Sequence, residues 1–156
     1  MSNKNETATE RQRVYPSTHK RIRIRAAKEG KQLAALRQIN TAILHLHAGE
    51  YACAITLAGA AEDLLGDIEP DHLWKVLMQR RPQDHSEKEW AAMFNETRNW
   101  LKHPTENLGD QRHIEEFETV IMVIRATSKF FARYGKGSEQ MNDFVEWCRK
   151  HNYISR

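Results

Sequence analysis

The chain has little of what cross-linked or membrane-spanning proteins need. Its 156 residues include only two cysteines, Cys53 and Cys148, which lie in apolar, helix-like surroundings without a CxxC pair or a histidine at metal spacing. No disulfide framework is therefore expected, and both thiols are predicted to be free and buried. Charged residues interrupt every apolar run well before the roughly 20 residues that a membrane span requires.

Targeting signals are also missing from the first residues. The segment MSNKNETATERQR lacks the apolar stretch of a signal peptide. We therefore expect a cytoplasmic protein that does not associate with a membrane. With 40% apolar residues, a chain of this length can form one hydrophobic core but is too short for two comfortable domains.

Positive charge is concentrated at one end. Residues 1–28 carry eight lysines and arginines against two glutamates, a net charge of +6, which leaves −3 for residues 29–156 because the whole chain carries +3. Such an arm predicts attraction to a polyanion, with Arg21, Arg23 and Arg25 as candidate RNA contacts, or docking on DNA. A solvated leader explains it equally well. The letters RIRIR fit either a short strand or the start of a helix.

The rest of the chain predicts helices and no further strand. Apolar residues recur at spacings of three and four, and glycine, proline and capping residues separate the segments. We expect a hairpin of two helices, a short helix before Pro82, a helix that a Ser86/Glu89 capping box starts, a long helix and a last helix that Ser138 caps. The predicted ranges are 31–48, 51–67, 71–81, 86–103 and about 110–134, followed by a last helix that begins after Ser138 and includes Cys148.

Four of these helices have a predicted inner face. The second is rich in small residues and should form the buried centre of an all-α bundle. Its small residues are Ala52, Ala54, Ala58, Gly59, Ala60 and Ala61. The other predicted inner residues are Leu33, Leu36, Ile39, Ile43 and Leu46 in the first helix, Ile114, Phe117, Ile121, Ile124 and Phe131 in the long helix, and Met141, Phe144, Val145 and Cys148 in the last.

The stretch FNETRNWLKHPTENLG, residues 94–109, carries the candidate chemistry. At about 100° per residue the helix has an apolar stripe, an opposite polar ladder and a neighbouring basic row. The stripe is Trp90, Phe94, Thr97 and Leu101; the ladder is Asn95, Asn99 and His103; the basic row is Arg98 and Lys102. The ladder is either a solvated face with cations at a helix C-terminus or a site in which Arg holds a phosphate and His moves a proton.

Other ionisable residues are weaker candidates. Glu62 and Asp63 lie inside the small-residue helix, where a helix-surface or interhelical salt bridge is favoured over pairing with Arg98 to tune the site. His45 and His47 point to different sides of one helix and cannot bind one metal together. The paired ExxH motifs of di-iron bundles are missing, so no metal and no cofactor are expected.

The motif RNWLKH, from Arg98 to His103, resembles the signature of HEPN domains, in which Arg is followed by a polar residue and, a few residues later, by His. The order of elements is similar too, with a helical hairpin, a small-residue second helix (ITLAGAAEDLLG) and the motif late in a further helix. The resemblance covers about residues 31–134. It implies a HEPN-type up-down helical bundle at residues 29–156, with the basic arm at 1–28 and an extra C-terminal helix.

The resemblance also implies a function. HEPN domains pair through the motif helix, and many are metal-independent endoribonucleases, often toxins or antiphage effectors with an antitoxin partner. Arg98 would stabilise charge on the scissile phosphate, His103 would assist the 2′-hydroxyl or protonate the leaving oxygen, and Asn99 would position His103. Lys102 would contact RNA, with Asn95, Glu62 and Asp63 in support. Other HEPN domains are non-catalytic dimerisation or RNA-binding modules, which is the alternative.

Overall fold

Helices make up the regular structure of the chain. The computed structural model describes residues 29–68, 82–103 and 109–154, and within these ranges there is no strand. This confirms the all-α prediction. The helices are α1 (Lys31–His47), α2 (Tyr51–Leu65), α4 (Glu87–Lys102), α5 (Glu116–Tyr134) and α6 (Glu139–Lys150). The basic arm, with Arg21, Arg23 and Arg25, and the short helix predicted at 71–81 lie outside the described residues.

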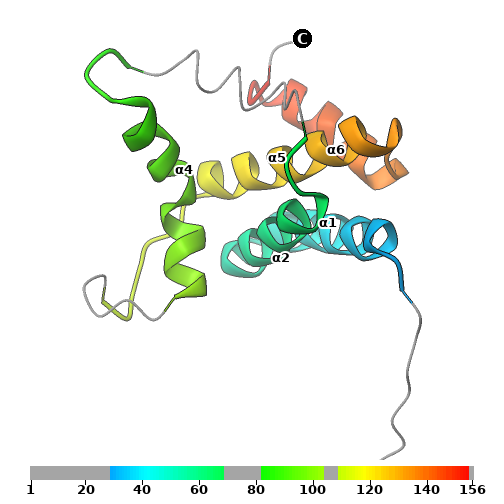
Figure 1. Cartoon of the computed structure of the whole chain (residues 1–156), viewed down its shortest axis with the longest axis horizontal. Coiled ribbons are helices and arrows are strands. Elements are labelled where there is room, and N and C mark those ends of the chain that lie inside the picture. The colour runs from blue at the N-terminus through cyan, green and yellow to red at the C-terminus, as the bar shows by residue number, and fades with distance from the viewer. Residues whose placement is uncertain (1–28, 69–81, 104–108, 155–156) are drawn as a thin grey trace, which may run out of the picture.

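The first two helices form the predicted hairpin and lie antiparallel, side by side (Figure 1). Gly49 adopts a left-handed conformation (φ 75°) in the turn, a geometry that favours glycine. Its amide donates to the carbonyl of Leu46 at 3.1 Å. The small residues of α2 do form a buried centre, because Ala54, Ala58, Gly59 and Ala61 are buried between the neighbouring helices.

Helix α5 covers this hairpin, with α6 on one side and α4 running across the other end (Figure 1). Every residue from Thr119 to Thr127 is buried, so α5 is enclosed on almost all sides rather than along one stripe. The helix starts at Glu116, later than the predicted residue 110. Glu115 and Glu118 form a capping box at this start. Among its predicted inner residues, Ile121 and Ile124 are buried, Ile114 and Phe131 are half-buried, and Phe117 is 51% exposed.

Two further expectations about burial were wrong. Leu33, predicted on the inner face of α1, is exposed because it lies in the first turn of the helix, before Ala35 and Ile39 enter the core. Cys53 is also exposed, whereas Cys148 is buried as predicted. Burial raises the pKa of the Cys148 thiol to about 12.

Helix α4 is attached differently from the others. The predicted capping box between Ser86 and Glu89 is present and starts the helix. Thr97 is its one buried residue, and Leu101 packs against the apolar core from a half-buried position. The predicted apolar stripe of α4 is otherwise half-buried, so polar contacts add to this partial apolar burial in holding the helix. No helix within the described ranges is long and apolar enough to cross a membrane.

Candidate functional site

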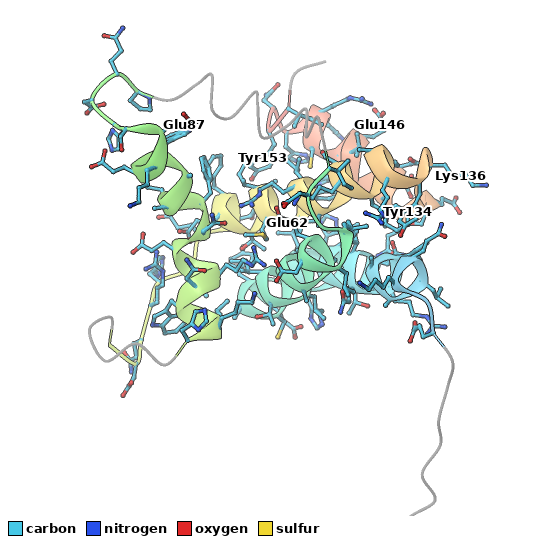
Figure 2. All side chains as sticks on the ribbon, in the orientation of Figure 1. Glu62, Glu87, Tyr134, Lys136, Glu146 and Tyr153 are labelled. Carbon is cyan, nitrogen blue, oxygen red and sulfur yellow. The ribbon has the colours of Figure 1, made fainter. Side chains whose placement is uncertain are left out.

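A buried carboxylate joins three helices. Glu62 on α2 is 4% exposed and is the one buried acid in the described part of the chain. Its Oε1 accepts from Nη2 of Arg125 at 2.7 Å and lies 3.2 Å from Nζ of Lys129, both on α5. Its Oε2 lies 3.4 Å from Nη1 of Arg98 on α4. Figure 2 shows Glu62 at the junction of these helices, far from Glu87 at the start of α4. Three cations thus offset the cost of burying one carboxylate.

The motif arginine lies across the backbone of α2. Nη2 of Arg98 donates to the carbonyl of Gly59 at 3.1 Å and to Oδ1 of Asp63, and its side chain is only 13% exposed. Its Nε is buried without a hydrogen-bond partner among the described residues. A Cβ at Gly59 would lie 2.7 Å from that Nε, so only glycine allows this approach.

Asp63 extends the network to the end of α4. Its Oδ2 accepts from Nζ of Lys102 at 2.8 Å, while Oδ1 accepts from Arg98. Partial burial raises the pKa of Asp63, but the hydrogen bonds from Arg98 and Lys102 lower it more, and the pKa lies below its ordinary value. Both acids therefore form interhelical salt bridges, and both contact Arg98, which was the less favoured of the two expectations.

The predicted polar ladder on α4 is not one exposed face. Asn95 is half-buried, and its Oδ1 accepts from Nη1 of Arg125 at 2.9 Å. Its amide group donates to the carbonyl of Ala91 at 3.2 Å. The expectation that Asn95 faces away from the domain was therefore wrong, because the ionic network of α2 and α5 provides a polar surface on which it packs.

The other two members of the ladder are exposed. Asn99 lies on the outer face of α4, and its carbonyl accepts from the amide of His103 at 3.0 Å. His103 is the C-terminal cap, with an extended backbone, and its side chain is exposed. The motif thus has an anchored Arg98 and, five residues further along the chain, an imidazole that is accessible to a ligand.

A second polar cluster holds the opposite flank of α4. Arg112, in the segment before α5, donates to Oγ1 of Thr97 at 3.0 Å and to Glu96 at 2.9 Å. Thr97 in turn donates to Glu118 on α5 at 3.0 Å. The hydrogen bond from Arg112 is the main cause that lowers the pKa of Glu96. Nε1 of Trp100 also donates a hydrogen bond to the carbonyl of Gly109 at 3.1 Å.

Sequence reasoning missed three members of the site, which are Arg125, Lys129 and Gly59. A signal was available for the first, because Arg125 interrupts the otherwise apolar run TVIMVIRAT. A charge in such a run needs a buried partner of opposite sign, and Glu62 interrupts the apolar run of α2 in the same way. Matching these two charges would have predicted that α2 and α5 pack against each other.

The remaining histidine candidates lie elsewhere. His45 contacts Glu50 across the hairpin turn, and the ring of His47 lies edge-on to Trp147 at 5.1 Å. His113 is exposed and lies in the segment before α5. The described residues contain no group of three or more His, Cys, Asp or Glu side chains arranged to hold a metal ion.

Comparison of the chain with protein-family models, with curated proteins and with solved structures finds no match. The HEPN resemblance therefore stays a prediction that rests on the motif and on the order of helices. The geometry of the site is the basis for any functional argument.

The close approach of Arg98 to Gly59 gives a double-mutant prediction. Gly59→Ala should lower the free energy of unfolding by about 1 kcal/mol, because the clash with Arg98 exceeds the gain of about 1 kcal/mol in helix propensity. In an Arg98→Ala background the same change should become stabilising, because the clash is gone. Urea denaturation of the four proteins measures both effects. The same sign in both backgrounds would contradict the contact.

Proposed function

We propose that the chain is a metal-independent endoribonuclease of HEPN type that acts as a homodimer. The observation that carries the proposal is an anchored Arg98 near the end of α4 together with an exposed His103 at the C-terminal cap of the same helix. Asn99 and Lys102 are exposed beside them. The end of α4 therefore combines an anchored cation, an exposed cation and an imidazole.

This combination suits transfer at a phosphodiester. In RNA the 2′-hydroxyl attacks the adjacent phosphorus and the bond to the 5′-oxygen of the next nucleotide breaks, which leaves a cyclic phosphate and a free 5′-hydroxyl. One proton leaves the 2′-oxygen and one joins the leaving oxygen, so the reaction needs a base and an acid. His103 can serve in either role, and Arg98 can stabilise the additional negative charge on the phosphate. DNA lacks the internal nucleophile.

The need for two proton transfers supports a dimer. Each chain contributes one His103, so a two-fold axis beside α4 would bring a base and an acid to one phosphate. Helix α4 offers a free surface for such contact, because Ala92, Met93 and Asn99 on its outer side are exposed. Met93 is one of four large apolar side chains exposed within the described ranges, with 48% of its surface accessible.

A second candidate function is a non-catalytic dimerisation or RNA-binding module of the same type. The observation that favours it is the engagement of Arg98 by Glu62, Asp63 and the Gly59 carbonyl. A guanidinium held this way already has its charge offset, and a purely structural role would explain its burial. The two candidates differ in whether RNA is cleaved.

The enzyme proposal predicts RNA cleavage in the presence of EDTA. Purified protein incubated with tRNA should produce fragments. His103→Ala should slow cleavage by at least about a hundredfold, because proton transfer by a positioned side chain raises the reaction rate by a factor of about 10²–10⁴. Gel analysis of the products measures the rate. His103→Ala is the decisive variant because the exposed side chain can be removed without disturbing the core, whereas Arg98 also holds α4.

A matched control is His85→Ala, at the other end of α4, which should cleave at the wild-type rate. His85 contacts Asp84 and Trp90 but lies outside the motif. Intact RNA with Arg98 and His103 in place would reject the enzyme and leave the non-catalytic module. Cleavage by His103→Ala at the wild-type rate would place the activity elsewhere.

The dimer proposal predicts a particle of twice the 18.2 kDa chain mass by sedimentation equilibrium. Met93→Glu should convert it to a monomer, because a charge would be buried in the paired surface of α4. Leu44→Glu on α1 is the matched control, since Leu44 is 62% exposed and lies away from the proposed axis, and it should stay dimeric. A monomer at all concentrations, or equal effects of the two variants, would remove the shared site.

A further inference from the structure

Asp63 bridges the two cations of the motif, Arg98 and Lys102. One carboxylate oxygen accepts from Arg98 and the other accepts from Lys102 at 2.8 Å. The two non-bridging oxygens of a phosphodiester are likewise attached to one atom, and each can face a separate cation. The Asp63 side chain is 54% exposed, so another anion can reach the same position.

Glu62, the neighbouring acid, is not exchangeable in this way. Its side chain is 5% exposed, and it retains Arg125 at 2.7 Å and Lys129 at 3.2 Å whatever happens at Asp63. Removing Glu62 from these partners would leave buried charges unpaired. The two adjacent acids therefore differ, because Glu62 is fixed by burial, whereas Asp63 is itself 54% exposed and has one exposed partner, Lys102.

Arg98 would remain in place if Asp63 moved away. Nη2 donates to the carbonyl of Gly59 at 3.1 Å, and Nη1 lies 3.4 Å from Glu62. Displacement of Asp63 would then expose one edge of a positioned guanidinium beside the ammonium of Lys102. The four cations at this junction outnumber the two acids, so the local field favours a replacement anion.

We propose that Asp63 occupies, in the free protein, the position that a phosphodiester of bound RNA takes, so that Arg98 and Lys102 form a phosphate-binding pair closed by an internal anion. RNA binding then requires Asp63 to swing out into solvent. The choice of RNA as the ligand rests on the proposed function. Because Arg98 and Lys102 lower the pKa of Asp63, this internal anion stays charged at neutral pH and competes with RNA throughout the physiological range.

The test measures binding separately from cleavage. A 2′-O-methyl oligoribonucleotide keeps the phosphates but lacks the nucleophile, so its dissociation constant is independent of catalysis. Asp63→Asn should bind it about threefold to tenfold more tightly than the wild type, because the competing anion is replaced by a neutral amide. Asp143→Asn on α6 is the matched control, since it makes the same change in net charge at an exposed position outside the network.

Lys102→Met, an exposed substitution, provides a second variant. It should weaken binding, reduce the slope of log K against log salt by about 1, and remove the gain that Asp63→Asn produces. Unchanged or weaker binding by Asp63→Asn, an equal gain in Asp143→Asn, or wild-type binding by Lys102→Met would each overturn the proposal.

The outcomes also separate this inference from the enzyme proposal. Tighter binding by Asp63→Asn with uncleaved natural RNA would support the phosphate-binding pair and reject the nuclease. Cleavage of natural RNA by the wild type without tighter binding by Asp63→Asn would support the nuclease and reject the internal anion.

Discussion

The burial of one carboxylate, Glu62, is the constraint on which the arrangement of the helices around the site depends. A charged group in the middle of a small-residue helix is costly unless cations surround it. Arg125 and Lys129 approach from α5 and Arg98 approaches from α4, so the compensation of a single charge draws three helices together. Glycine at position 59 makes the approach of Arg98 possible by removing the side chain that would block it.

This constraint explains why α4 is both well placed and weakly covered. The helix buries one residue, Thr97, and is held by Arg98 and Asn95 on one flank and by the Arg112 cluster on the other. Its outer side, with Ala92, Met93 and Asn99, is exposed. The motif consequently divides into a structural half, in which Arg98 is fixed by the fold, and an accessible half, in which Asn99 and His103 face outward.

The sequence predicted local features well and long-range ionic contacts poorly. The Gly49 turn, the Ser86 capping box and the small residues of α2 were predictable because each depends on neighbours within a few positions. Asn95 was placed on the wrong side because its partner Arg125 lies 30 positions away in the chain. Phe117 was misplaced because α5 begins only at Glu116, which leaves Phe117 in the exposed first turn. The burial of α5 from Thr119 to Thr127 likewise reflects packing on several sides, which a single-face pattern cannot express.

Replacing Glu62 by glutamine tests the central claim most directly, since the shape of the side chain is kept and only the charge is lost. The account predicts a loss of about 3–5 kcal/mol in the free energy of unfolding and faster amide hydrogen exchange in α4 than in α1. Glu87→Gln, at the exposed start of α4, is the control and should change stability by less than about 0.5 kcal/mol. A Glu62→Gln protein as stable as this control, with α4 equally protected, would contradict the account.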